Sequence, residues 1–114
     1  MRDWFVVSTT MTGLDPLSMF RLDGQVVIVT GASSGLGDRF ARVLHAVGAQ
    51  VVVAARRVER LDTLATELPG TLAIGVDLSL EADRERLVAE TLDRFGRIDV
   101  LVNNAGIGHA VSVE

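Results

Sequence analysis

The 114-residue sequence contains no cysteine, no tyrosine and no lysine, and all 11 of its basic residues are arginines. Without cysteine, the chain can form neither a disulfide framework nor a thiolate metal site or nucleophile. A chain of this composition is compatible with a reducing compartment. We therefore expect a cytoplasmic location and no metal site.

Long apolar runs and clusters of positive charge are lacking as well. The longest apolar stretches, 26–29 and 51–55, are far shorter than the roughly 20 residues that a membrane helix needs. The N-terminus does not resemble a signal peptide, because Phe5-Val6-Val7 gives way at once to serine and threonine. The formal net charge is −4, and no basic cluster is long enough to follow a phosphate backbone. We expect a soluble protein with neither a membrane nor a nucleic acid as partner.

The hydrophobic pattern divides the chain near residue 22. Residues 1–22 show no sustained periodicity and are expected to form a flexible arm. From residue 23 onward, buried strands are predicted at 26–29, 51–55, 72–76 and 98–102 from runs of β-branched and apolar residues. Apolar residues at helical spacing predict helices at 36–47, 58–68 and 80–95, which end at Gly48, Pro69-Gly70 and Gly96.

This alternation predicts an α/β fold with a doubly wound parallel sheet, whose strand order is 3-2-1-4 counted from strand 26–29. Residues 23–114 would then form only the N-terminal half of such a domain, truncated after the fourth strand. The first two helices are expected to share one face and the third to lie on the other. The outer edge of the fourth strand then has no partner, which favours a homo-oligomer or another partner that covers it.

A glycine-rich segment, Thr30-Gly31-Ala32-Ser33-Ser34-Gly35-Leu36-Gly37, lies between the first predicted strand and helix. In a phosphate loop at this place, one glycine permits the tight turn and another lets backbone N–H groups approach a pyrophosphate. The third brings the helix close to the strand. The helix N-terminus then favours the negative charge. The alternative is a simple turn, but strand, loop, helix and second strand all follow in register.

The Gly-x-x-x-Gly-x-Gly spacing after a threonine, together with Asn103-Asn104-Ala105-Gly106 after the fourth strand, resembles the short-chain dehydrogenase/reductase family. The resemblance covers residues 22–107 and implies an NAD(P)-binding Rossmann-type fold. An ordinary strand-ending turn is the alternative for the Asn-Asn-Ala-Gly run. The resemblance implies that the following residues lie at the cofactor: Gly31, Ser33, Ser34, Gly35, Leu36, Gly37, Asn103, Ala105 and Gly106.

The end of the second strand bears on the choice of cofactor. An NAD site would place a carboxylate there for the ribose 2′-hydroxyl, but the sequence has Ala55, Arg56 and Arg57. Two arginines at the start of a helix oppose its dipole, whereas a 2′-phosphate would bind to them. NADP is therefore favoured over NAD. The alternative is that both arginines are merely solvated.

Asp77 and Leu78 follow the third predicted strand. The resemblance implies that Asp77 accepts a hydrogen bond from the adenine amino group and that Leu78 lines the adenine pocket. Helix capping is the alternative role for Asp77, although Ser79 lies closer to the helix. We expect His45 to be a surface residue and His109 a loop residue.

In the family, hydride transfer relies on a serine, a Tyr-x-x-x-Lys pair and usually an asparagine, all C-terminal to the Asn-Asn-Ala-Gly run. No tyrosine or lysine exists in this sequence, so we assign no catalytic residue. The favoured hypothesis is the N-terminal NADP(H)-binding part of an NAD(P)-dependent oxidoreductase for a carbonyl or alcohol substrate, inactive alone. The alternatives are a standalone dinucleotide-binding module and a nonfunctional fragment that associates with a partner.

Overall fold

The computed structural model describes residues 5–7, 22–33 and 35–104. From residue 26 onward, strands and helices alternate as the hydrophobic pattern predicts. The elements are β1 (Phe5–Val7), β2 (Val26–Thr30), α1 (Gly35–Ala46), β3 (Gln50–Ala55), α2 (Val58–Glu67), β4 (Leu72–Gly75), α3 (Glu81–Phe95) and β5 (Val100–Asn103).

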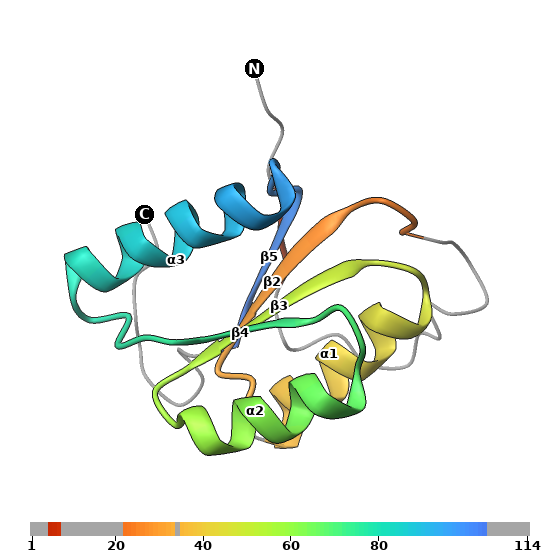
Figure 1. Ribbon diagram of the computed structural model, residues 1–114, viewed down its shortest axis with the longest axis horizontal. Coiled ribbons are helices and arrows are strands. Elements are labelled where there is room, and N and C mark those ends of the chain that lie inside the picture. Colours follow the sequence, from red (N-terminus) through yellow and green to blue (C-terminus); the bar gives the residue numbers. More distant parts are fainter. Residues whose placement is uncertain (1–4, 8–21, 34, 105–114) are drawn as a thin grey trace.

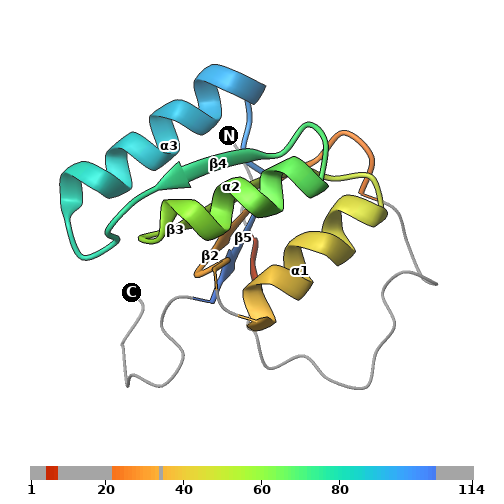
Figure 2. The same ribbon diagram turned by 60° about the horizontal axis from the view of Figure 1, so that its bottom comes forward.

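The strands form one parallel sheet in the order β1-β5-β2-β3-β4. Its β4-β3-β2-β5 part is the predicted order 3-2-1-4, so the Rossmann-type doubly wound fold class is confirmed. Helices α1 and α2 cover one face of the sheet and α3 lies on the other (Figure 1). Figure 2 shows α1 and α2 side by side, and an ion pair between Arg42 and Glu67 joins them.

The short strand β1 corrects two predictions. It pairs in parallel with β5, with Phe5 opposite Val100 and Val7 opposite Val102. Residues 1–22 are therefore not a flexible arm throughout, and the outer edge of the fourth predicted strand does have a partner. The physical reason is that an open edge leaves N–H and C=O groups unpaired, and a short β-prone run satisfies them. The domain boundary near residue 22 and the covering by a second copy or partner stay predictions.

The two central strands are buried on both faces. Strand β2 is buried along its whole length, and β3 is buried from Val51 onward. One apolar cluster joins the sheet to Ala41, Leu61 and Leu64 of the two neighbouring helices. A second cluster, on the α3 side, contains Leu87 and Ile98. Continuous β-branched runs are what a parallel sheet covered on both sides requires.

Helix α3 buries only part of its apolar surface. Leu87 and Thr91 are buried, but Val88 and Leu92 are 39% and 38% exposed. One residue turns the helix by about 100°, so Val88 and Leu92 lie on the flank of the buried stripe. Among the described residues α3 is the only helix on this side of the sheet, so no neighbouring helix covers that flank.

The glycines after α1 and α3 adopt the left-handed conformation that ends a helix. Gly48 has φ 99° and Gly96 has φ 79°, and the Gly96 N–H donates to the carbonyl of Leu92 at 2.8 Å. Both helix ends therefore follow the sequence prediction. In the described part of the chain, no helix has the length and apolar character needed to cross a membrane.

Candidate functional site

A buried polar cluster joins the C-terminal ends of β2 and β5. Thr30 Oγ1 accepts from the Asn104 N–H at 3.0 Å and lies 3.3 Å from both Val102 O and Asn103 Oδ1. Asn104 is 4% exposed, and its Nδ2 donates to Gly31 O at 3.0 Å. These bonds fix the start of the glycine-rich loop to a segment 73 residues further along the chain.

The glycines at the start of α1 differ in their surroundings. Gly37 is buried, and a Cβ there would overlap Gly31 O and lie 2.7 Å from Asn104 Nδ2. Glycine at this position therefore lets the helix pack directly against the loop. At Gly35, apart from its chain neighbours and the backbone of α1, no atom of the described residues lies within 4 Å of where a Cβ would be. The N-terminus of α1 is thus open on that side, and open helix N-termini attract anions.

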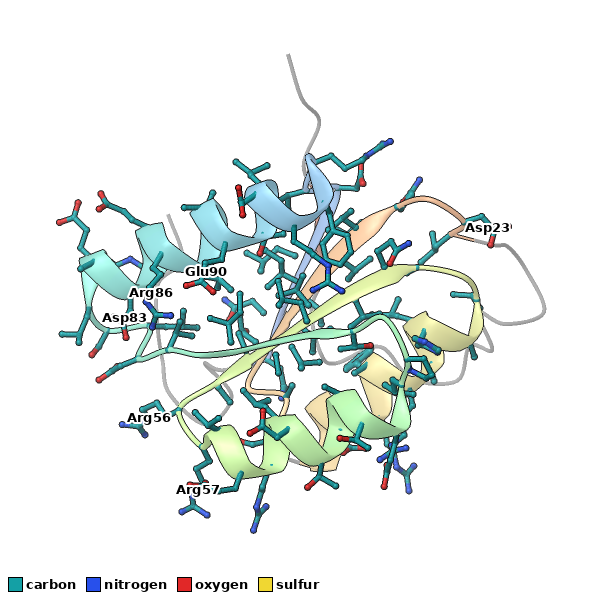
Figure 3. The ribbon with its side chains drawn as sticks, viewed as in Figure 1. Asp23, Arg56, Arg57, Asp83, Arg86 and Glu90 are labelled. Atoms are coloured by element: carbon teal, nitrogen blue, oxygen red, sulfur yellow. The ribbon has the colours of Figure 1, made fainter. Side chains whose placement is uncertain are left out.

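A cavity of about 400 Å³ lies where β3 and β4 end, beside the glycine-rich loop. The C-terminal ends of parallel strands meet at one edge of the sheet, so segments far apart in sequence converge there. Figure 3 shows Arg56 and Arg57 where β3 leads into α2. The lining residues are Gly31, Ser33, Ala55, Arg56, Arg57, Val76, Asp77, Leu78 and Ser79.

The cavity thus brings together six of the predicted site residues. Gly35, Leu36, Gly37 and Asn103 are not part of its lining. Gly35 and Leu36 are exposed at the start of α1, and the Asn103 side chain contacts Thr30. The predicted residues Ser34, Ala105 and Gly106, and also His109, lie outside the described residues.

Asp77 is held as an ionised acceptor. Its Oδ1 accepts from the Ser79 hydroxyl at 2.7 Å and from the Ser79 N–H at 3.0 Å. These two hydrogen bonds, with a smaller contribution from the Arg56 charge, hold the pKa of Asp77 below its usual value. The capping role is wrong for both Asp77 and Ser79, because the N-cap of α3 is Leu80 and no side chain caps it.

Arg56 and Arg57 lie at the start of α2. Arg57 is the N-cap residue, and no side-chain hydrogen bond caps the helix there. A positive charge at a helix N-terminus opposes the dipole. Ala55, where an NAD site would have a carboxylate, is 8% exposed. One turn on, Arg60 Nη1 donates to Ser33 O at 3.3 Å and so ties α2 to the glycine-rich loop.

Comparison with known proteins identifies the family. A model of the short chain dehydrogenase family matches residues 25–114. The chain belongs to this family. As a member of the short-chain dehydrogenase family, it has that family's NAD(P)-binding fold, in which the glycine-rich loop joins β2 to α1.

Curated relatives of the chain include several dehydrogenases. The meso-2,3-butanediol dehydrogenase of Serratia marcescens is 42% identical over 95 residues, which are 82% of this chain and 38% of the relative. The L-fucose dehydrogenase of Bos taurus is 45% identical over 86 residues, 75% of this chain and 32% of the relative. The 11-beta-hydroxysteroid dehydrogenase-like 4A of Arabidopsis thaliana is 42% identical over 95 residues, 79% of this chain and 32% of the relative.

Solved structures give the same result. The 3-ketoacyl-(acyl-carrier-protein) reductase of Brucella melitensis, solved with NADH, has 43% identity and a TM-score of 0.73. The match covers 77% of this chain and 36% of that one. The hydroxysteroid dehydrogenase of Escherichia coli has 32% identity and a TM-score of 0.72, over 75% of this chain and 37% of that one. The chain spans about a third of the length of the curated relatives it matches.

Sequence reasoning missed Thr30 and Asn104, which make the hydrogen bonds across the loop. A signal for Thr30 exists, because the parallel pairing sets it opposite Asn103 in the register of β2 and β5. The role of Asn104 had no comparable signal. Its neighbours in the Asn-Asn-Ala-Gly run are equally polar or small, and only the backbone course after β5 turns its side chain toward Gly31.

Proposed function

We propose that the chain is the NADP(H)-binding part of a short-chain oxidoreductase that acts on a carbonyl or alcohol group. One observation carries the proposal: a single cavity is lined by Gly31 and Ser33 of the glycine-rich loop, by the Arg56-Arg57 pair and by Asp77. Each of the three suits a different part of the dinucleotide. The NADH-bound relative from Brucella melitensis supports a dinucleotide as the ligand class.

The pyrophosphate is proposed to lie at the N-terminus of α1. The open space beside Gly35 admits a phosphate without contact with a side chain at that position. Gly31, with φ 66°, turns the chain sharply before the helix begins. Backbone N–H groups and the helix dipole then provide the attraction for the negative charge.

The 2′-phosphate of NADP is proposed to bind to Arg56 and Arg57. Guanidinium groups bind phosphate oxygens with two parallel hydrogen bonds, and both arginines line the cavity. The apolar Ala55 offers no acceptor for the ribose 2′-hydroxyl that would favour NAD. NADP is therefore preferred to NAD, and Asn103, Ala105 and Gly106 are proposed to pass near the cofactor.

The adenine base is proposed to lie against Asp77 and Leu78. The lowered pKa keeps Asp77 negatively charged at neutral pH, so its carboxylate can accept a hydrogen bond from the adenine amino group. Leu78 supplies an apolar wall next to it. An acceptor beside an apolar surface suits a planar base that carries an amino group.

When bound, the reduced nicotinamide would supply a hydride to a carbonyl carbon, and the oxidised form would accept one from an alcohol carbon. Proton transfer in this family relies on a tyrosine next to a lysine, and these 114 residues contain neither. We therefore propose that the chain alone binds the cofactor and does not catalyse the reaction.

The matched relatives are named for a sugar, a diol and a steroid, so this shared third of their length does not specify a substrate. The absence of cysteine suits a cytoplasmic location.

The proposal is tested by Arg56→Asp, with titrations of NADPH and NADH. The affinity for NADPH should fall by about tenfold or more, because a charged hydrogen bond contributes about 1.5–3 kcal/mol. The affinity for NADH should change little. Arg94→Asp, which makes the same charge change on an exposed position of α3, is the control and should leave both affinities unchanged. An equal loss for the two cofactors would show that Arg56 does not bind the 2′-phosphate.

A further inference from the structure

One wall of the cavity is formed by the segment that follows β4. Three side chains from the first turns of α3 bind the backbone of this segment and of Gly75, the last residue of β4. Asp83 Oδ2 accepts from the Asp77 N–H at 2.7 Å. Arg84 Nη1 donates to the carbonyl oxygen of Leu78, also at 2.7 Å. Arg86 Nη2 donates to the carbonyl oxygen of Gly75 at 2.7 Å. The backbone on both sides of Asp77 is therefore held from α3.

Asp83 and Arg86 belong, with Glu90, to a connected group of charged side chains on α3. Arg86 lies 3.2 Å from Glu90 and 3.8 Å from Asp83, and Figure 3 shows the three side chains along α3. The Asp83 side chain is 25% exposed, whereas those of Arg86 and Glu90 are 43% and 45% exposed. Asp83 is thus the member most shielded from water, where a charge-assisted hydrogen bond is strongest.

The hydrogen bond from Asp83 fixes the peptide group that carries Asp77. Rotation of this peptide would swing the Asp77 carboxylate away from its present direction. The Oδ1 of that carboxylate is already bound to Ser79, and within the described residues no hydrogen bond reaches its Oδ2. The direction of Oδ2 therefore depends on how the Asp77 backbone is held.

We propose that Asp83, assisted by Arg84, is a positioning residue that directs Asp77 and Leu78 toward the adenine base. This inference rests on the proposed function, because it assumes that an adenine nucleotide fills the cavity. Asp83 itself touches no ligand. It acts by holding the backbone of Asp77, which is proposed to contact the base. Loss of the Asp83 carboxylate should therefore weaken recognition of the base more than binding of the phosphates.

The test compares NADPH with its hypoxanthine analogue, in which an oxygen replaces the adenine amino group. The wild-type chain should bind NADPH more tightly than the analogue. Asp83→Ala should raise the Kd for NADPH by about tenfold. The ratio of the analogue's Kd to the Kd for NADPH should fall toward one. Asp83→Asn keeps an oxygen that can accept from the Asp77 N–H, so it should restore most of the ratio. Arg84→Met, at an exposed position, should lower the ratio in a chain that remains folded.

Asp93→Ala is the matched control, since Asp93 is an exposed aspartate of the same helix. It should leave both the affinity and the ratio unchanged. If Asp83 has only a structural role, Asp83→Ala should weaken binding of both nucleotides equally and leave the ratio of the two Kd values unchanged. This result would overturn the inference but not the proposed function. A wild-type chain that binds neither nucleotide would overturn the proposed function and the inference with it. A wild-type ratio of one would overturn the inference while leaving NADPH binding intact.

Discussion

Replacement of Gly37 by alanine would place a methyl group where α1 packs against the glycine-rich loop. The new Cβ would overlap the carbonyl oxygen of Gly31 and lie 2.9 Å from the Cα of Ala32 and 2.7 Å from Asn104 Nδ2. Two of these three neighbours are backbone atoms. Rotation of a side chain cannot relieve the overlap, so either the loop or the helix must move.

The expected cost follows from three contributions. Overpacking of a buried position costs about 1–3 kcal/mol. Displacement of Asn104 weakens its hydrogen bond to Gly31, which is worth about 1 kcal/mol. Alanine is favoured over glycine inside a helix by about 0.5–1 kcal/mol, which offsets part of the loss. Gly37→Ala should therefore lower the free energy of unfolding by about 2 kcal/mol.

Urea unfolding measures this change, and Gly35→Ala is the matched control. Among the described residues that are not its chain neighbours or helix backbone, none comes within 4 Å of a Cβ at Gly35, so this variant should be as stable as the wild type or slightly more stable. Its methyl group would nevertheless occupy the proposed phosphate space, so NADPH affinity should fall. Equal unfolding midpoints for Gly37→Ala and the wild type would refute the packing argument. Unchanged NADPH affinity in Gly35→Ala would refute the placement of the pyrophosphate.

Two further predictions concern polar groups. Thr30→Val should lower the free energy of unfolding by about 1–3 kcal/mol in urea, because the buried Asn104 N–H loses its acceptor, whereas Thr30→Ser should be close to wild type. Wild-type stability of Thr30→Val would contradict that role. Hydrogen bonds from Ser79 lower the pKa of Asp77. The contribution of the ionised Asp77 carboxylate to stability is therefore fully present above the usual carboxyl pKa. It is lost only as the pH falls through the lower pKa of the folded state. Calorimetric NAD affinity should therefore stay constant between about pH 5 and pH 8, and a steep fall on acidification within this range would show that Asp77 is not the acceptor.

Much of the fold could be predicted because its signals are local and strong. The β-branched runs 26–29 and 51–55 are buried strands, and Gly48 and Gly96 end their helices in the left-handed conformation. The strand order follows from the alternation of strands and helices. The pairing of Phe5–Val7 with β5 could not be predicted, because three residues are too few to show a period and their partner lies far along the chain.

The outline of the candidate site was predictable for a topological reason. Parallel strands bring the segments after each strand to one edge, so Arg56 and Asp77 had to lie near the glycine-rich loop. The supporting contacts were not predictable. Whether Asp83 turns toward the Asp77 N–H or toward solvent depends on the angle at which the chain enters α3. Spacing alone does not determine that angle, and the same holds for the Thr30–Asn104 hydrogen bond.

The most direct test of NADP(H) binding is a calorimetric titration of the purified chain with NADPH and, separately, with NADH. Saturable binding of both, with NADPH bound more tightly, is the predicted result. Because the described residues already form the cavity, this binding should need no other chain. Binding of neither nucleotide, or tighter binding of NADH, would contradict the proposal that these residues form an NADP(H) site.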